Sequence, residues 1–362
     1  MMRRRGRGFV DANSSVTAPA GAAWERVMSE NDCYETYEEV PAGYDLFNAR
    51  PEELDRYGIP QRPDAVAEPS LFKFWTKLVS PPFLAKRPTF SSIDPDPDAR
   101  TEPTERMVEP SRGGTLESSL NWSGAVVSAP WPKRIVLAVA GWTAPMVGRP
   151  SADALFTEAN IPKSLVWVGL DGHNGRLPKI SLPQIGTGHW PDGQPPHFAF
   201  WGWWRHSSKN RVKRIDDFDV RAGHEVLAGL AVLISEDVLF FIKNQRTGEF
   251  RSFLAKRQPL RDIEPLGSSV EWVVERPTAP ISHKFYPLAA YCPSVDFKYC
   301  MALAADRPLA PGRLMTLADN GRMIKMREAF ANPYRTVHVS RAKRRHDPDG
   351  SIGVTCSFHE PT

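Results

Sequence analysis

After residue 120, short apolar or β-branched runs separated by turn residues follow one another, and this pattern constrains the fold more than any other feature. Such a composition favours β-strands over helices. The runs that we expect to form strands are residues 135–140, 165–170, 226–234, 238–242, 271–275, 322–326, 336–339 and 352–355. Strands that follow strands, with few helical periods between them, predict an all-β sandwich of two antiparallel sheets.

The composition agrees with an all-β fold and says little about partners. The 34 prolines and 11 tryptophans are many for 362 residues, which favours loops and short strands over helical bundles. A hydrophobic content of 41% and a charged content of 24% are ordinary for a soluble globular protein. The net charge of +4 is too small to indicate a polyanionic partner by itself.

We divide the chain into a tail with a short helix near residues 22–28 (residues 1–40), an N-terminal extension with a linker (41–117) and the β-sandwich (118–362). In the extension, Pro51 followed by two acids predicts a helix start, and Gly58 predicts its end. Residues 71–75 predict an amphipathic helix that ends before Pro81, and residues 88–117 predict an extended linker. The extension is either a propeptide or a clamp on the sandwich, and we favour the clamp.

Five sequence blocks, in this order, resemble the glutamic peptidases, also called eqolisins. They are N-W-S-G-A-V (121–126), G-W-T-A-P (141–145), W-V-G-L-D-G (167–172), L-P-Q-I-G (182–186) and V-E-W-V-V-E (270–275). One block alone would be weak, but together they are specific. The resemblance covers residues 121–358. It implies a concanavalin-like (lectin-like) β-sandwich that hydrolyses peptide bonds.

The resemblance also implies that Gln184 and Glu271 are the catalytic pair. A carboxylate can take a proton from water and return it to the leaving nitrogen, while a primary amide can donate to the oxyanion. A free glutamate titrates at about pH 4.3, so we expect activity at acidic pH. Glu275 shares a strand face with Glu271. Glu271 is preferred because it precedes Trp272, and Glu275 is expected at the rim or in a salt bridge.

Five further residues are expected to bind substrate. Trp167 and Asp171 match cleft positions of the family. Trp122, Trp201 and Trp203 would add flat aromatic walls for an extended peptide. Packing in the core of a sandwich explains any single one of these tryptophans equally well.

Two alternative functions fit the same sequence. Gly202 stands where family members commonly carry a glutamate in W-x-E-W, which favours an inactive relative that binds peptide or carbohydrate in the same groove. An inserted proline, Pro183, precedes Gln184 and restricts the local backbone. The basic runs 3–5, 205–214 and 341–345 could contact nucleic acid, although solvated loops explain them better.

We expect a monomer that acts on peptides or proteins without a cofactor. We expect no metal site either, because the four histidines (173, 189, 197, 206) lack metal-ligand spacing. No apolar run approaches the length of a membrane helix. The basic start lacks the apolar core of a secretory signal, whereas the family is mostly secreted, so the compartment stays open. The cysteines (33, 292, 300, 356) form no CxxC pair. Cys292 and Cys300 could bridge a hairpin, but reduced thiols are favoured.

Overall fold

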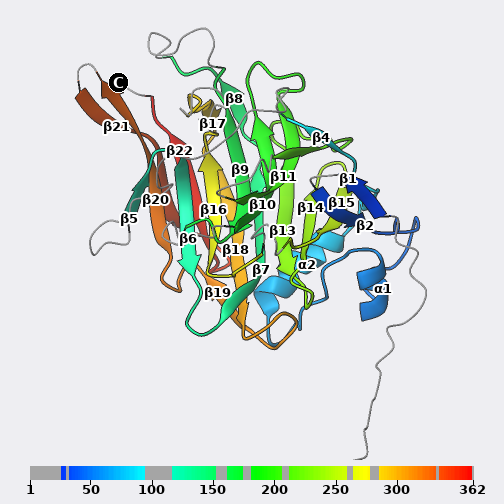
Figure 1. Ribbon diagram of the computed structural model, residues 1–362. Helices are drawn as coiled ribbons and strands as arrows, with labels where there is room; N and C mark the ends of the chain where they lie inside the picture. The colour runs from blue at the N-terminus through cyan, green and yellow to red at the C-terminus, as the bar shows by residue number, and fades with distance from the viewer. Residues whose placement is uncertain are drawn as a thin grey trace, which may run out of the picture.

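The computed structural model describes residues 26–29, 32–93, 116–151, 161–173, 181–205, 212–258, 264–277, 285–331 and 334–360. Strands dominate this part of the chain, and two helices lie near its N-terminal end (Figure 1). The expected all-β fold of two antiparallel sheets with a partly helical N-terminal extension is confirmed. No helix among the described residues is long and apolar enough to cross a membrane.

The first sheet, sheet A, is antiparallel along its main row. Its strands, in spatial order, are β1 (Arg26–Ser29), β2 (Asp32–Thr36), β15 (Glu249–Ala255), β14 (Val238–Asn244), β13 (Glu225–Val232), β7 (Arg134–Thr143), β18 (Val295–Ala305) and β19 (Arg313–Thr316). A two-residue strand, β3 (Leu84–Ala85), pairs in parallel with β15. The N-terminal extension therefore covers the edge that β15 would otherwise expose.

The second sheet, sheet B, carries most of the sequence blocks described above. Its strands, in spatial order, are β4 (Phe90–Ser92), β12 (Lys213–Ile215), β11 (His197–Arg205), β10 (Ser181–His189), β9 (Ser164–Leu170), β16 (Ser269–Glu275), β6 (Trp122–Ser128), β20 (Arg322–Ala331), β21 (Tyr334–His346) and β22 (Ile352–Phe358). The parallel strand β5 (Leu116–Ser119) lies on β20. Strands β8 (Met146–Gly148) and β17 (Ala290–Cys292) form a separate pair.

The two sheets meet face to face and are also joined through β18, which pairs with β7 in sheet A and with β22 in sheet B. Alternate residues from both sheets fill the space between them. Val168, Ile185 and Trp272 come from sheet B, and Leu230 and Phe240 come from sheet A; all are fully buried. This alternation is the period of two that a strand imposes on its side chains.

Two tryptophan indoles tie the sheets together across the core. Trp272 of β16 donates its Nε1–H to the backbone oxygen of Val139 at 3.0 Å. Trp142 of β7 donates to the hydroxyl of Thr187 on β10 at 2.9 Å. Because β10 and β16 are the strands that carry Gln184 and Glu271, these bonds fix both strands relative to sheet A.

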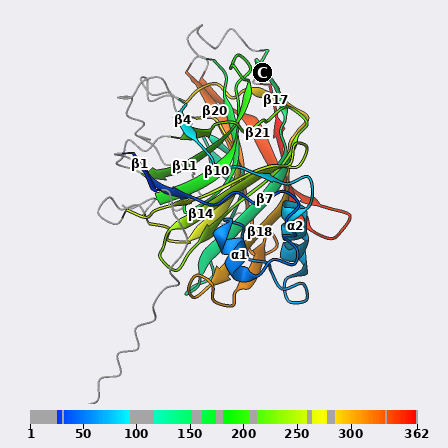
Figure 2. The ribbon, with the colours of Figure 1, turned by 90° about the vertical axis from the view of Figure 1, so that its right-hand side faces the viewer.

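The N-terminal extension packs as a third layer on the outer face of sheet A (Figure 2). Helix α1 (Pro51–Arg56) is followed by Gly58 at φ +61°, and helix α2 (Pro69–Val79) ends before Pro81, so both expected helices are confirmed. Phe74, Trp75 and Leu78 of α2 belong to one buried cluster with Leu227 and Phe241 of the sheet.

Two polar contacts hold the end of α2 on this surface. Lys243 of β14 donates to the backbone oxygen of Ser80 at 2.5 Å, just after the helix. Lys77 pairs with Glu225 at 2.6 Å. This layer lies on the side of sheet A that faces away from sheet B. We propose that the N-terminal extension is a clamp on the sandwich rather than a propeptide.

Two expectations for the N-terminal segments need correction. Residues 26–29 form a strand rather than part of a helix, and residues 22–25 lie outside the described residues. In the expected linker, residues 90–92 and 116–119 are strands, because each finds a partner strand in sheet B. Residues 94–115 of that linker lie outside the described residues.

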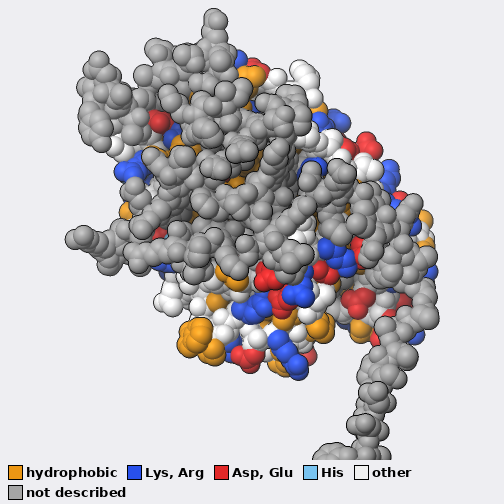
Figure 3. All heavy atoms as spheres, in the orientation of Figure 1, with side chains coloured by type: hydrophobic (Ala, Val, Ile, Leu, Met, Phe, Trp, Pro, Cys, Tyr) orange, Lys and Arg blue, Asp and Glu red, His pale blue; other side chains and the backbone are white. Residues whose placement is uncertain are grey.

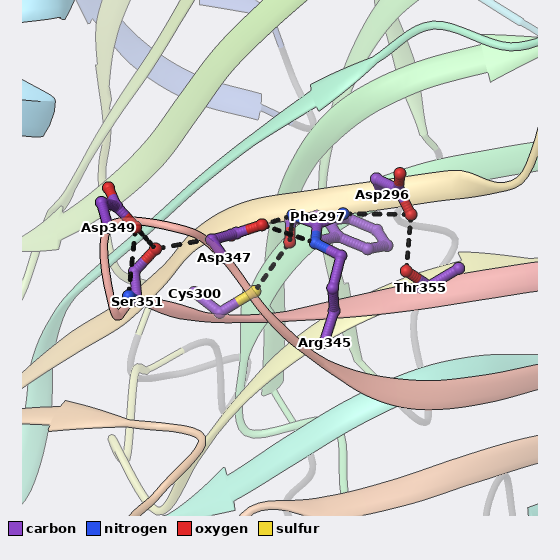
Figure 4. Close-up of polar contacts among 8 residues, drawn as sticks. All are labelled: Asp296, Phe297, Cys300, Arg345, Asp347, Asp349, Ser351 and Thr355. Atoms are coloured by element: carbon purple, nitrogen blue, oxygen red, sulfur yellow. Dashed lines mark hydrogen bonds and ion pairs between the residues drawn. The ribbon is translucent and has the colours of Figure 1, made fainter.

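A network around Arg345 secures the corner where β18 joins β21 and β22 (Figure 4). The guanidinium pairs with Asp347 at 2.8 Å and with Asp296 at 3.0 Å. Asp296 also accepts from the hydroxyl of Thr355 at 2.6 Å. Arg345, which belongs to the basic run 341–345, therefore links β21 to β18 directly and to β22 through Asp296.

The bridge considered between Cys292 and Cys300 is not formed. Cys292 is exposed on β17, whereas Cys300 is buried in β18. The thiol of Cys300 instead lies 3.8 Å from the backbone oxygen of Phe297 (Figure 4). Both residues are free cysteines, as the reduced alternative expects.

The Arg345→Met variant is expected to lose about 2 kcal/mol of unfolding free energy, because two carboxylates lose their shared cation. Urea denaturation followed by circular dichroism measures this change. The exposed Lys343 on the same strand provides the control, since Lys343→Met is expected to change stability by less than about 0.5 kcal/mol. Equal stabilities for the two variants would contradict the structural role of Arg345.

Candidate active site

Gln184 and Glu271 lie on the two strands that flank β9. Each is paired in register with Gly169, Gln184 from β10 and Glu271 from β16. Residues directly opposite one another in antiparallel strands project from the same face. Neighbouring strands are about 4.8 Å apart, so the two Cα atoms are separated by roughly 10 Å. Both side chains therefore leave the same face of sheet B, on either side of Gly169.

Gly169, which lies between the two side chains, is closely covered by its neighbours. A Cβ atom at this position would lie 2.9 Å from the Pro183 backbone oxygen and 3.0 Å from the Trp167 ring. Any larger residue would therefore clash with both neighbours. A glycine here allows a close approach that no other residue permits.

Two oxygen atoms of this pair are buried without a hydrogen-bond partner in the described part of the chain. They are Oε1 of Gln184 and Oε2 of Glu271. The Gln184 residue is 5% exposed and Glu271 is fully buried. Buried acceptors of this kind are uncommon in folded proteins, and they cost free energy when they stay unpaired. Each of the two oxygens therefore has hydrogen-bonding capacity that no described residue satisfies.

The other carboxyl oxygen of Glu271 is held firmly. Its Oε1 accepts from the hydroxyl of Ser269 at 2.5 Å and from the backbone N–H of His173 at 3.0 Å. Burial raises the pKa of Glu271 to about 8; nearby Asp171 adds to this rise, while the hydrogen bonds from Ser269 and from the backbone oppose it. Glu271 therefore carries a proton below about pH 8, whereas a free glutamate would be ionised above about pH 4.3.

Glu275 lies on the same face of β16 but has a structural environment. Its carboxyl accepts from the Trp167 indole at 2.7 Å and from the Asn121 amide at 3.3 Å. Burial raises its pKa to about 7. It was expected at the rim or in a salt bridge; the structure instead places it between an indole and an amide.

Trp122 and Trp167 lie on the same face as Gln184 and Glu271. Both are fully buried, and their rings meet edge to face at 5.2 Å. They belong to a cluster that also contains Leu182 and Val273. The structure brings these two expected substrate-binding residues to the face of sheet B that carries the pair, where both rings are buried.

Asp171 is used by the fold. Its carboxylate accepts from the backbone N–H groups of Leu266, Gly267 and Ser268 at 2.8, 2.9 and 2.5 Å. The Ser268 hydroxyl adds a further bond at 2.8 Å. Asp171 therefore anchors the segment that leads into β16, the strand of Glu271, and its part in substrate binding stays a prediction.

Trp201 and Trp203 lie on the opposite face of sheet B from Gln184. Gln184 pairs with Gly202, so the residues on either side of Gly202 must project the other way. Trp201 packs against Phe253 at 4.8 Å between ring centroids, and Trp203 donates to the Ser181 hydroxyl at 2.6 Å. Both lie in the core between the sheets. Their expected place in the substrate groove is wrong for this physical reason.

Sequence reasoning missed residues on the face that carries Gln184. Phe198 and Phe200 of β11 are buried in the cluster on this face, and Trp204 packs against that cluster. The alternation along β11 selects them once the Gln184–Gly202 pairing is known. A second missed group, Glu117, His173 and Arg322, carried no local signal, because its members come from three distant segments.

Gly202 leaves room beside the Gln184 amide. A Cβ there would lie 3.5 Å from the Val212 side chain and 3.8 Å from Nε2 of Gln184, which are ordinary contact distances. The missing carboxylate at this position therefore does not disturb the pairing of Gln184 and Glu271 with Gly169.

Comparisons with known proteins place the chain in a family. A sequence model of the Peptidase A4 family matches residues 120–340, more than half of the chain. Among solved structures, scytalido-glutamic peptidase with a transition state analog inhibitor is similar, with 16% identity over 66% of this chain and 98% of that chain, at a TM-score of 0.49.

Two further solved structures are similar at low identity. SCP-B, a member of the eqolisin family in complex with the tripeptide Ala-Ile-His, shares 16% identity over 66% of this chain and 98% of its own, at a TM-score of 0.46. Aspergilloglutamic peptidase from Aspergillus niger shares 14% sequence identity over 55% of this chain and 99% of its own, at a TM-score of 0.41. A search of curated proteins found no match. From the sequence match over residues 120–340, this chain belongs to the Peptidase A4 family.

Proposed function

We propose that this protein is an acid-acting endopeptidase in which Gln184 and Glu271 activate a water molecule for attack on a peptide bond. Membership of the Peptidase A4 family supports peptide-bond hydrolysis. The observation that carries the assignment to these two residues is the pair of partnerless buried oxygens on either side of Gly169. Peptides or proteins are the proposed substrates.

The raised pKa of Glu271 changes the order of proton transfers from the one that a free glutamate would suggest. Below about pH 8 the carboxyl begins the cycle protonated, with Oε2 as its available oxygen. We assign it first as a general acid, which gives its proton to the scissile carbonyl oxygen while water adds to the carbonyl carbon. The Gln184 amide accepts from this water through Oε1 and donates to the developing oxyanion through Nε2.

The remaining transfers use the same carboxyl. Glu271, now ionised, takes a proton from the added water and leaves a neutral tetrahedral intermediate. It then gives this proton to the amide nitrogen, and the C–N bond breaks to release the amine. Finally, it takes the excess proton from the protonated carboxylic acid product. The cycle consumes one water and returns Glu271 to its protonated form.

The nucleic-acid alternative has little support in the described part of the chain. Two arginines of the run 341–345 are used within the fold: Arg344 donates to the Gly321 backbone oxygen, and Arg345 pairs with Asp296 and Asp347. Where side chains are coloured in Figure 3, basic and acidic groups are interspersed. Neither this alternative nor the binding-only alternative suggested by Gly202 is favoured.

Removal of either proposed catalytic group is expected to abolish most hydrolysis. Glu271→Gln and Gln184→Ala should each lower kcat/KM on denatured casein or a peptide by at least about 100-fold, because proton transfer or oxyanion stabilisation is lost. Glu275→Gln is the matched control, because the Glu275 carboxyl is bound by Trp167 and Asn121 rather than by the partners of Glu271. Its kcat/KM should stay within about fivefold of the value for the natural protein. Pepstatin should not inhibit, because no aspartate pair is involved. Full activity of Glu271→Gln would contradict the assignment.

The pH dependence distinguishes the acid-first order from a base-first order. With a pKa of about 8, the protonated form of Glu271 predominates below pH 7, so kcat/KM should be level there and fall about tenfold per pH unit above pH 8. Initial rates on a fluorogenic peptide from pH 3 to 10 measure this, with circular dichroism to verify that the protein stays folded. A rate that instead climbs from pH 4 to 8 would show that the ionised carboxyl is the active form.

A further inference from the structure

Three side chains that the proposed mechanism does not use gather beside Glu271. They are Glu117 of β5, His173 just after β9, and Arg322 at the start of β20. His173 Nε2 lies 2.6 Å from Glu117 Oε2, and Arg322 Nη1 lies 2.9 Å from Glu117 Oε1. Arg322 pairs in register with Val126, which in turn pairs with Glu271. We call these three residues the Glu117 cluster.

The contacts of the cluster fix one tautomer of His173. Arg322 Nη2 lies 3.3 Å from His173 Nδ1, and a guanidinium can only donate. Nδ1 is therefore the acceptor, and the ring proton is on Nε2, where it is donated to Glu117. The Glu117 side chain is 1% exposed, and each of its two oxygens has a partner. The imidazole is thus held between one donor and one acceptor.

The residue that carries this imidazole also makes a hydrogen bond to Glu271. The backbone N–H of the same residue, His173, donates to Glu271 Oε1 at 3.0 Å. Asp171 anchors the other end of the short segment 171–173 through its bonds to residues 266–268. Between them, a Cβ at Gly172 would lie 2.6 Å from the Trp122 ring. The segment is therefore held at both ends and packed closely in the middle.

We propose that Glu117, His173 and Arg322 are positioning residues that hold the His173 backbone N–H on Glu271 Oε1 and so leave Oε2 as the oxygen that exchanges protons. This inference rests on the proposed function of Glu271. The Glu117 carboxylate is deeply buried, and an unpaired buried charge is costly. Here Arg322 and His173 both pair with it, so the carboxylate can hold the two side chains in place.

A purely structural role must be separated from positioning, because the cluster also links two strands. Glu117 of β5 pairs in register with Ile324 of β20, two residues after Arg322. Loss of the cluster could therefore loosen β5 without any effect on proton transfer. The pH profile of kcat/KM is a readout that a loss of stability alone does not change.

His173→Ala removes the imidazole and keeps the backbone N–H. We expect kcat to fall about 10- to 100-fold with KM within about twofold, because Glu271 is misplaced while substrate binding is retained. The alkaline limb of the kcat/KM profile should move up by about 0.5 pH units, since a weaker hydrogen bond to the carboxylate favours its neutral form. His173→Gln, whose amide supplies one donor and one acceptor, should recover most of the kcat.

Arg344→Ala is the matched control. Arg344 donates to the backbone oxygen of Gly321 at 3.0 Å, next to Arg322 in the chain, and contacts neither Glu117 nor His173 in the hydrogen bonds of the described residues. This variant should lower the thermal unfolding midpoint while kcat and the alkaline limb stay unchanged. An equal loss of kcat in Arg344→Ala and His173→Ala would show that activity follows stability, and would overturn the proposal.

Failure of the proposed function can be recognised separately. If Glu271→Gln hydrolyses substrate as fast as the natural protein, the proposed function is wrong and kinetics no longer report on the cluster. The titration of the Glu271 carboxyl, followed by ¹³C NMR and assigned with Glu271→Gln, then decides. A midpoint that rises in His173→Ala supports positioning; the same midpoint in both proteins overturns it.

Discussion

The alignment of Gln184, Gly169 and Glu271 across three adjacent strands is the constraint on which the site depends. Two strand pairings, β10 with β9 and β9 with β16, fix this row, and a shift of either by one residue would turn one side chain to the opposite face. Hydrogen bonds across the core that involve Trp142 and Trp272 hold β10 and β16, the two strands that flank β9, against sheet A. The core between the sheets thus serves the site by fixing its register.

The burial of Glu271 links stability to chemistry. A carboxyl whose pKa is about 8 in the folded protein and about 4.5 in the unfolded chain binds its proton more tightly when folded. This contribution to stability is fully present below pH 4.5 and is lost as pH rises to 8, by about 1.4 kcal/mol per pH unit. Glu275 contributes with the same sign. Buried His189, whose pKa is lowered by burial, contributes with the opposite sign. The two glutamates therefore favour the folded protein in acid.

Local patterns in the sequence predicted both helices and many strands of the sandwich, although residues 26–29, 90–92 and 116–119 were not predicted as strands. The β-branched run 238–242 and the Pro51 and Gly58 signals for α1 are examples, because each depends on residues close in the chain. The same patterns could not orient Trp201 and Trp203, since their face is set by the pairing of Gln184 with Gly202. They also could not reveal the Glu117 cluster or the raised pKa of Glu271, because both arise from contacts between distant segments and from burial.

The most direct test of the shared site is a crystal structure at a resolution that shows ordered water. We expect one water molecule within hydrogen-bond distance of both Gln184 Oε1 and Glu271 Oε2, because these two buried oxygens have no partner among the described residues. Side chains that point to opposite faces of sheet B, or that share no water or substrate atom, would contradict the proposed site.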